Sequence, residues 1–536
     1  MPFDAEQLAH LKLLHRDNHG EGPTELTNAP IFTESVRRYA LSSPSKSFSQ
    51  YGLLGGDAFK MSISPQPHNL MSSKGDPRLY QNITVPASVF ICGSQGSGKS
   101  HTLGCMLENC LIPSGANKLP RPLTGIVFHY DSFTSDAGGA PCEAAYLSSH
   151  PDIRVRVLCP PTNIFQIRRI YKALPNVHVQ ELRFDERDLN TKRMLDLMAV
   201  SSVQGGSIPL YMHVVTRILR QLRIMQQKSN TPFKYRDFKR YLDAEDLTPS
   251  QRCPLQQRLD TLESFMSKEE NHLAPSGGGN KKKPVFSAKQ GSRWEPKAGH
   301  LTIIDLSCPC VTAEAACSLF NVCLSLFLEQ ESTIGRVIAL DEAHKYMTDT
   351  AECETLTQAL LTTIRLQRHQ GARVIISTQE PTISPKLLDL CSVTIVHRFT
   401  SPHWLRALKS HLAGATVLNK SHCVANADLG YSVDGSPICQ DVGMELFAQI
   451  LALRTGEALL FAPSAAVDVQ TGTANDAMTK TPSSVPNSED FLAPTVITGN
   501  GDADSVTDLL RLEHGFMKTY VRKRITQDGG GSVMAG

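Results

Sequence analysis

The sequence lacks an excess of charge of either sign. Its 536 residues include 54 Lys and Arg and 52 Asp and Glu, which gives a net charge of +2. A protein that coats nucleic acid or covers a membrane surface usually carries a large excess of positive charge, because both surfaces are negatively charged. The nearly neutral chain as a whole therefore belongs to neither class. Any surface that binds nucleic acid must therefore be local.

Long apolar runs are also missing. Residues 1–22 carry charges throughout and contain no continuous apolar segment, so they do not resemble a secretory signal. The most apolar long stretch, residues 315–328, is too short to span a bilayer and is interrupted by Ser318 and Asn321. These absences predict an intracellular protein, cytoplasmic or nuclear, with no membrane partner.

Regular cysteine spacing is absent as well. The chain has 14 cysteines, of which only Cys308 and Cys310 form a close pair in sequence. A zinc finger requires a second close pair of ligands, and none follows at the required spacing. The pattern favours reduced, ordinary cysteines over a zinc site.

The sequence does contain a glycine-rich loop between an apolar run and a helical segment. VFIC at 89–92 leads into GSQGSGKS at 93–100, and HTL follows. This is the strand, loop and helix order of a phosphate-binding P-loop. The glycines allow backbone N–H groups to turn toward phosphates, and the helix directs its positive N-terminal dipole at them. A glycine-rich turn without a ligand is the alternative.

ATP and Mg²⁺ are the expected ligands of this loop. We expect Lys99 to reach the β and γ phosphates and Ser100 to offer its hydroxyl to Mg²⁺. The candidate nucleotide-binding residues are Gly93, Ser94, Gln95, Gly96, Ser97, Gly98, Lys99, Ser100 and His101.

A second apolar run ends in two carboxylates. VIAL at 337–340 precedes Asp341 and Glu342. We expect Asp341 to hold the water shell of Mg²⁺ and Glu342 to polarise the attacking water, so the pair predicts ATP hydrolysis. A P-loop alone would not separate an ATPase from a kinase or a passive nucleotide binder. The alternative for the pair is an ordinary buried strand with acidic capping residues.

Three further polar residues are candidates for catalysis. Gln379 ends the apolar strand 372–379 and is a candidate γ-phosphate sensor, although a polar residue there also simply begins a loop. Arg365 and Arg368 are three apart on a predicted helix and are expected to share one face. An arginine supplied across a subunit boundary can neutralise charge in the transition state. A solvated helix face is the alternative for both.

The order of apolar runs predicts an α/β fold with a mostly parallel sheet and helices on both faces, of the P-loop NTPase (RecA/ASCE-like) kind. Residues 1–80 are expected to form a partly ordered arm, and residues 81–465 the ATPase domain. That domain would include a helical insertion and a flexible linker at about 225–299. Residues 466–500 have the composition of a disordered linker, and residues 501–536 that of a C-terminal helix and tail.

These motifs resemble the HerA/FtsK superfamily of ring-forming motor ATPases, the HerA-like branch in particular. The blocks that carry the likeness are GSQGSGKS at 93–100, IIDLS at 303–307, VIALDEAHKYM at 337–347, RLQRHQGARVIISTQEPT at 365–382, VHRF at 396–399 and RTGEALLFAP at 454–463. The resemblance implies that Lys99, Ser100, Asp341, Glu342 and Gln379 are the nucleotide, magnesium, catalytic and sensor positions. It also implies a homo-oligomeric ring, such as a hexamer, that acts on nucleic acid.

Other features bear on how far this resemblance extends. Residues 1–80 show no β-rich stretch like the small barrel of archaeal HerA, which favours ATP hydrolysis over DNA translocation as the better supported activity. The alternative function is a nucleotide-controlled scaffold or signalling ATPase without translocase activity. The sequence contains no LSGGQ-like signature, which argues against an ABC protein. The terminal residues 522–536 resemble those of filamentous-fungal P-loop proteins.

Overall fold

The computed structural model describes residues 26–42, 47–63, 75–132, 138–197, 210–267, 291–348, 350–412, 442–471 and 507–529. The chain forms two compact units. Unit 1 comprises residues 1–87, 113–120 and 392–523, and unit 2 comprises residues 88–112, 121–391 and 524–536.

The sheet of unit 2 is parallel throughout its described strands. Their order is β4 (Ser88–Cys92), β11 (Ala372–Thr378), β10 (Arg336–Leu340), β6 (Thr124–His129), β9 (His300–Asp305), β7 (Arg154–Cys159) and β8 (Val177–Glu181). Every residue of β4, β6, β10 and β11 is buried. Strands buried on both faces are typical of a parallel sheet covered by helices.

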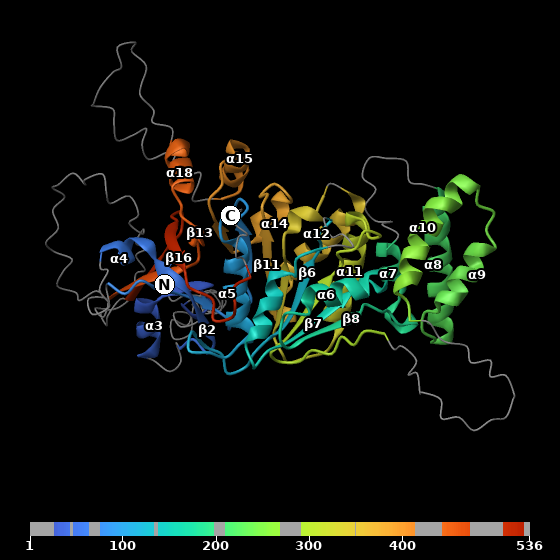
Figure 1. Cartoon of the computed structure of the whole chain (residues 1–536), viewed down its shortest axis with the longest axis horizontal. Coiled ribbons are helices and arrows are strands. Elements are labelled where there is room, and N and C mark those ends of the chain that lie inside the picture. Colours follow the sequence, from blue (N-terminus) through green and yellow to red (C-terminus); the bar gives the residue numbers. More distant parts are fainter. Residues whose placement is uncertain are drawn as a thin grey trace, which may run out of the picture. The chain divides into compact units, whose positions relative to one another are not determined.

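Helices cover both faces of this sheet. α5 (Lys99–Leu111) connects β4 to β6, the next strand of unit 2 along the chain. In the sheet, β11 and β10 lie between these two strands, so the connection through α5 passes over both. The connections through α11 (Ala313–Glu329) and α12 (Ala351–Arg365) run in the opposite direction, from β9 to β10 to β11. Because parallel crossovers are right-handed, α5 lies on one face, and α11 and α12 pack together on the other (Figure 1). The predicted P-loop NTPase fold class is confirmed.

The helical insertion of unit 2 comprises α8 (Leu210–Ser229), α9 (Tyr235–Asp243) and α10 (Pro249–Phe265). Both α9 and α10 pack against α8 (Figure 1), and the side chains of Leu222, Phe238 and Leu259 are buried. The helices begin at Leu210, before the helical insertion that the sequence predicts at about 225–299. The flexible linker is predicted within the same range, of which residues 268–290 lie outside the described residues.

Unit 1 is built from strands that are mostly antiparallel. Their order is β15 (Thr507–Arg511), β14 (Ala466–Thr471), β1 (Ile31–Thr33), β3 (Arg78–Asn82), β2 (Tyr51–Asp57), β16 (Met517–Val521), β13 (Glu457–Phe461) and β12 (Val393–Val396). The β1–β14 pair is parallel, and the other neighbours along this order are antiparallel. β14 occupies the start of the predicted linker 466–500, whose remainder lies outside the described residues.

Residues 1–80, which the sequence predicts to be a partly ordered arm, contribute strands to unit 1. β1 and β2 lie within that range and β3 begins in it. Phe32 of β1 stacks on Phe48 with ring centroids 3.8 Å apart, and on Tyr80 of β3 at 5.6 Å. These aromatic side chains form a buried cluster, so the strands are stabilised by contacts between separate segments rather than by a long apolar run.

The prediction of a C-terminal helix at 505–523 is wrong, because the described part of this segment forms β15 and β16. β15 pairs with β14, and β16 pairs with both β13 and β2. Pairing with strands that are distant in sequence overrides the local helical pattern. None of the described helices combines the length and apolarity that a bilayer crossing requires.

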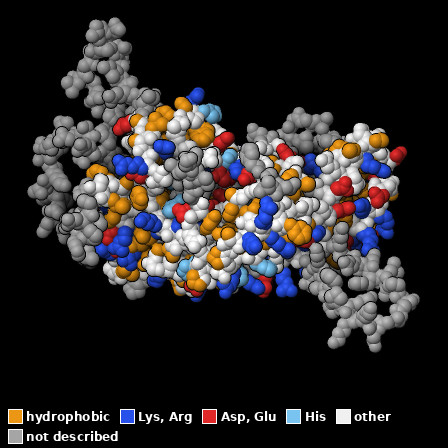
Figure 2. Space-filling view, viewed as in Figure 1, with side chains coloured by type: hydrophobic (Ala, Val, Ile, Leu, Met, Phe, Trp, Pro, Cys, Tyr) orange, Lys and Arg blue, Asp and Glu red, His pale blue; other side chains and the backbone are white. Residues whose placement is uncertain are grey.

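Charged side chains of both signs are interspersed over the visible face of the molecule (Figure 2). This distribution agrees with the nearly balanced composition of the sequence. A basic surface that could bind nucleic acid would therefore be confined to an individual helix or strand.

The C-terminal segment 524–529 packs against α5, the helix that follows the P-loop. Glu108 of α5 is fully buried, and its carboxylate accepts hydrogen bonds from the backbone N–H groups of Ile525 at 3.1 Å and Thr526 at 3.0 Å. The Thr526 hydroxyl donates to the same carboxylate at 2.6 Å. The segment therefore supplies Glu108 with the hydrogen bonds that a buried carboxylate requires.

Arg524 supplies the positive charge in this contact. Its side chain is 1% exposed and lies 3.7 Å from Glu108 and 2.7 Å from Glu143 of η3 (Glu143–Ser149). The guanidinium also lies over Gly104, where an added Cβ would be 3.0 Å from its carbon. A side chain at position 104 would thus displace Arg524.

Replacing Glu108 by alanine should destabilise unit 2 by about 3 kcal/mol, because it leaves Arg524 without one anion and two backbone N–H groups without an acceptor. Urea unfolding of the full chain measures the change. The matched control is Gln527→Ala, whose side chain is exposed and which should change stability by no more than about 0.5 kcal/mol. Equal effects of the two substitutions would show that this contact adds nothing to the fold.

Candidate nucleotide site

The carboxyl ends of adjacent strands bring the predicted chemical groups to one edge of the unit 2 sheet. β11 lies between β4, which leads into the P-loop, and β10, which ends just before Asp341. In register, Thr378 of β11 pairs with Cys92, and Ile376 pairs with Leu340. Gln379, the next residue of the chain, therefore emerges between the P-loop and Asp341.

The P-loop has the backbone conformation that its glycines predict. Residues 93–100 connect β4 to α5, whose first residue is Lys99. Gly96 has φ 72° and Gly98 has φ 109°, a region that residues with a side chain rarely adopt. The tight turn between strand and helix depends on these two positions.

Lys99 is held inside this loop. Its side chain is buried, and its Nζ donates a hydrogen bond to the Ser94 carbonyl at 3.0 Å. Burial lowers the pKa of Lys99, while the negative charges of Glu342 and Asp341 act in the opposite direction. The ammonium thus lies where phosphate oxygens would compete with a single neutral carbonyl oxygen for it.

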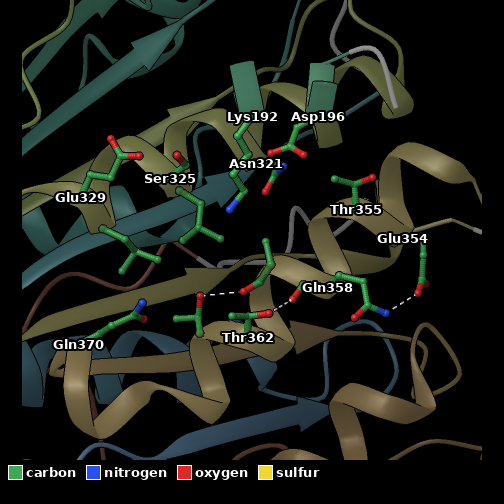
Figure 3. A pocket seen from close by; sticks show the side chains of 14 residues that line it. Lys192, Asp196, Asn321, Ser325, Glu329, Glu354, Thr355, Gln358, Thr362 and Gln370 are labelled. Carbon is green, nitrogen blue, oxygen red and sulfur yellow. Dashed lines mark hydrogen bonds between the residues drawn. The ribbon is translucent and has the colours of Figure 1, made fainter. Parts of the chain in front are cut away.

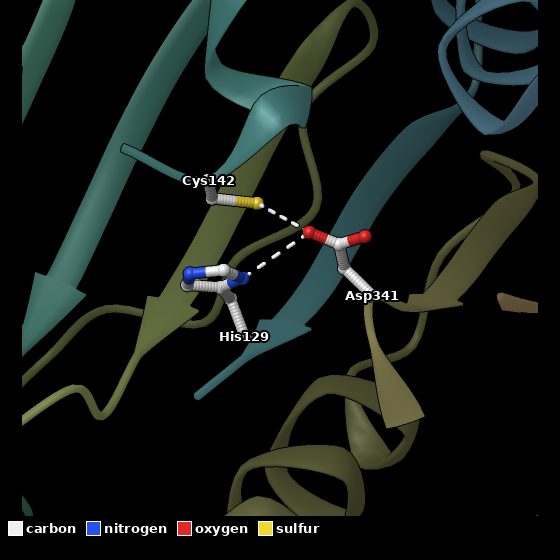
Figure 4. Close-up of side chains that lie close together, drawn as sticks. All are labelled: His129, Cys142 and Asp341. Atoms are coloured by element: carbon white, nitrogen blue, oxygen red, sulfur yellow. Dashed lines mark hydrogen bonds and ion pairs between the residues drawn. The ribbon is translucent and has the colours of Figure 1, made fainter. Parts of the chain in front are cut away.

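The two carboxylate oxygens of Asp341 have different surroundings. Oδ2 accepts a hydrogen bond from Nδ1 of His129 at 3.1 Å and from the thiol of Cys142 at 3.5 Å (Figure 4). Oδ1 is buried and has no hydrogen-bond partner among the described residues. Burial raises the pKa of Asp341, but the hydrogen bonds from His129 and Cys142 outweigh it and the net shift is downward.

This arrangement fits a magnesium site. A buried, ionised oxygen without a partner is a ready acceptor for a water molecule bound to Mg²⁺. Carboxylate and hydroxyl oxygens such as those of Asp341 and Ser100 are the donors that Mg²⁺ prefers.

Glu342 and Gln379 are in contact. The Nε2 of Gln379 donates a hydrogen bond to Oε2 of Glu342 at 3.3 Å, and Nδ1 of His344 lies 3.3 Å from the same oxygen. Glu342 has φ 49°, a left-handed conformation that is uncommon for residues other than glycine. Such conformations persist where the surrounding structure holds them, and they concentrate at functional sites.

The candidate arginines lie at the opposite edge of the sheet. Arg365 is the last residue of α12, and Arg368 belongs to the separate turn α13 (Gln367–Gln370). The prediction of one continuous helix is therefore wrong, because the chain breaks at Leu366 as it turns toward β11. Both arginines are exposed.

The length of β11 separates these arginines from the catalytic edge. Its seven residues run from Ala372, four positions after Arg368, to Thr378, just before Gln379. At about 3.3 Å per residue, the strand spans about 20 Å. Arg365 and Arg368 therefore cannot reach the P-loop of their own chain.

His101 directly follows Ser100, and its Nδ1 lies 2.9 Å from the carboxylate of Asp528 in the C-terminal segment. Its assignment as a nucleotide ligand stays a prediction. The sequence predicts no role for His129, Cys142 or His344. His129 could have been identified from the sequence because it ends an otherwise apolar strand. No sequence feature marks Cys142 as part of the site.

A cavity of about 530 Å³ lies away from this edge, among α7 (Thr191–Leu197), α11 and α12 (Figure 3). No residue of the P-loop lines it. Gln358 donates to Glu354 at 2.6 Å, and the Thr362 hydroxyl donates to the Gln358 carbonyl at 2.8 Å. These polar groups are therefore engaged with one another along α12.

No family model and no curated protein matches the chain. Among solved structures, it is similar to VirB4 of Thermoanaerobacter pseudethanolicus, with 11% identity, 76% of this chain and 93% of that chain covered, and a TM-score of 0.39. It is also similar to the bacterial conjugative coupling protein TrwBΔN70, with 12% identity, 77% and 91% covered, and a TM-score of 0.40.

A shorter match is the genome packaging NTPase B204 from Sulfolobus turreted icosahedral virus 2, solved with AMPPCP. The identity is 14%, the match covers 31% of this chain and 63% of that chain, and the TM-score is 0.20. Likenesses at this level carry no evidence about activity. The P-loop, the acidic pair and the strand order of the chain itself define its class as a P-loop NTPase fold.

Proposed function

We propose that the chain binds ATP with Mg²⁺ and hydrolyses it. The observation that carries this proposal is the convergence of Lys99, Asp341, Glu342 and Gln379 on one sheet edge, with Gln379 hydrogen-bonded to Glu342. A passive nucleotide binder needs the loop and the lysine but has no use for a second carboxylate held by an amide.

Each residue has a distinct part in this proposal. The loop N–H groups and Lys99 bind the β and γ phosphates. Ser100 and Oδ1 of Asp341 hold Mg²⁺, the latter through water, and the ion neutralises charge that develops on the phosphate oxygens. Glu342 accepts a proton from the attacking water. Gln379 orients the Glu342 carboxylate and, from the same position, senses the γ phosphate.

The proposal extends to a homo-oligomer, of the ring type that the resemblance to the HerA/FtsK superfamily implies. Arg365 and Arg368 are exposed and about 20 Å from their own catalytic edge. An arginine that stabilises the transition state from that position must act on a neighbouring subunit. This geometry supports a subunit interface in which one chain completes the site of the next.

Nucleic acid is the proposed partner of the oligomer. α8 contains no Asp or Glu, and its basic side chains are exposed. They are Arg217, Arg220, Arg223 and Lys228. Arg217 is paired with Glu245 at 2.5 Å. Arg220, Arg223 and Lys228 are therefore the charges expected to meet the phosphate backbone of nucleic acid, which attracts Lys and Arg irrespective of sequence.

The test is phosphate release from Mg²⁺–ATP with and without double-stranded DNA. We expect DNA to stimulate release and the stimulation to weaken as salt is raised. The double variant Arg220→Glu, Arg223→Glu should lose the stimulation, whereas Arg236→Glu on α9 should keep most of it. Slow release that DNA does not change would favour a nucleotide-controlled scaffold over a motor.

A further inference from the structure

A cluster of three buried side chains lies behind the catalytic edge, on the side of Asp341 away from its unpartnered oxygen. It contains His129, Cys142 and Asp341, whose potential ligand atoms all lie within 4.8 Å of one another (Figure 4). The residues are distant in sequence, which is why cysteine spacing alone gave no sign of them. Imidazole nitrogen, thiolate sulfur and carboxylate oxygen are the ligand types that Zn²⁺ takes in proteins.

The two distances that involve Asp341 match a tetrahedral site. With typical bond lengths to zinc, a nitrogen and an oxygen ligand lie about 3.3 Å apart, and a sulfur and an oxygen ligand about 3.5 Å apart. Nδ1 of His129 is 3.1 Å from Oδ2 of Asp341, and Sγ of Cys142 is 3.5 Å from it. Hydrogen bonds and a bound cation require nearly the same spacing here, so a cation can replace the hydrogen-bonding protons with little movement.

The backbone fixes these side chains in place. His129 is the last residue of β6, and Asp341 directly follows β10, the adjacent strand whose Leu340 pairs with Phe128 of β6. The N–H of Cys142 donates to the hydroxyl of Tyr171 at 2.9 Å. That hydroxyl donates in turn to a carboxylate at the end of β9, at 2.7 Å. A site held by strand ends and a buried hydrogen-bond chain is formed before any ion arrives.

We propose that His129, Cys142 and Asp341 bind a thiophilic divalent cation of the Zn²⁺ class, with solvent in the fourth position, and that the bound cation slows ATP turnover. Binding releases the thiol proton of Cys142 to solvent and leaves the His129 imidazole neutral with its proton on Nε2, so that Sγ and Nδ1 each present a lone pair. The slowing rests on the proposed ATPase function. A second dication on Asp341 withdraws the negative charge that the magnesium site uses.

Cobalt is the probe, because Co²⁺ occupies zinc sites and absorbs according to its ligands. The full chain, without nucleotide, is titrated with Co²⁺. We expect tetrahedral visible bands and a near-ultraviolet thiolate-to-cobalt band, both removed by stoichiometric Zn²⁺. A wild-type chain that shows neither band would overturn the proposal, whether or not it hydrolyses ATP.

Variants locate the site. Cys142→Ser keeps the size and the polar contact with Asp341 but should remove the thiolate band and weaken Co²⁺ binding at least about tenfold. The matched control is Cys353→Ser, since Cys353 and Cys317 are another buried pair, with Sγ atoms 3.0 Å apart. The control should retain the bands. Bands lost in Cys353→Ser and kept in Cys142→Ser would place the cation at the other pair and refute the assignment.

The effect on turnover is measured separately, as phosphate release before and after loading with one equivalent of Zn²⁺. We expect Zn²⁺ to slow the wild type at least about tenfold, a zinc-selective chelator to restore the rate, and Cys142→Ser to respond little relative to its own zinc-free rate. Cobalt bands in a chain without ATPase activity would sustain the metal site and refute the proposed function. If the protein shows the cobalt bands but its ATP turnover is unchanged by Zn²⁺, the proposed inhibition is refuted.

Discussion

Replacing the arginine that completes a neighbouring site, Arg365 or Arg368, by alanine should reduce ATP turnover by about 10³-fold or more while ATP binding survives. Both side chains are exposed at the edge of the sheet opposite the P-loop, with the full length of β11 in between. Under the proposed function, each subunit holds Lys99 and Glu342 and is expected to receive its arginine from another chain. Specific activity should also fall on dilution, because dissociated subunits lack this positive charge.

Mixing of variants tests the same geometry more sharply. An inactive arginine variant combined with Glu342→Gln should recover part of the activity, because some interfaces then pair an intact arginine with an intact glutamate. The control is Gln367→Ala, which lies between the two arginines and should leave turnover near the wild-type value. No recovery in mixtures whose subunits exchange, or activity that is unchanged on dilution to the monomer, would contradict an arginine acting across subunits.

Substitutions of Lys99 and Glu342 should both reduce ATP turnover strongly, but they should differ in their effect on ATP binding. Lys99→Ala should abolish nucleotide binding or hydrolysis, because its ammonium is the positive charge held inside the loop. Glu342→Gln should retain ATP but lose about 10²-fold or more in turnover, because an amide keeps the shape and cannot accept the proton. Nucleotide binding and phosphate release, measured on the same preparations, distinguish the two.

A matched control for the glutamate is Glu354→Gln on α12, which removes one carboxylate away from the nucleotide edge and should leave turnover unchanged. Undiminished turnover in a folded Lys99→Ala protein would refute the nucleotide site. An equal loss of ATP binding in Lys99→Ala and Glu342→Gln would refute the role given to the glutamate.

The sequence predicted the nucleotide edge because its signals are local. The P-loop is a strand, a loop and a helix within one short stretch, and its glycines match positive φ angles at Gly96 and Gly98. Asp341 and Glu342 likewise follow directly from an apolar strand. The contact between Gln379 and Glu342 then depends only on β11 lying next to β10 in the sheet.

Features that depend on pairing between strands far apart in the chain could not be predicted from the sequence. β16 pairs with β2 and β13, so its local helical pattern was outweighed by partners elsewhere in the chain. The role of His129 depends on its register beside Asp341, which no motif records. The spacing of Arg365 and Arg368 indicated a shared helix face, whereas the break at Leu366 and the direction of β11 decide where they lie.

The central claim is that this sheet edge hydrolyses ATP rather than only binding it. A single-turnover assay tests this most directly, with the wild-type chain in excess over radiolabelled ATP and Mg²⁺, at a concentration high enough for subunits to associate. The account predicts that bound ATP is converted to ADP and phosphate, and that Glu342→Gln holds the ATP intact over the same period. Wild-type protein that binds ATP and returns it unhydrolysed would contradict the account.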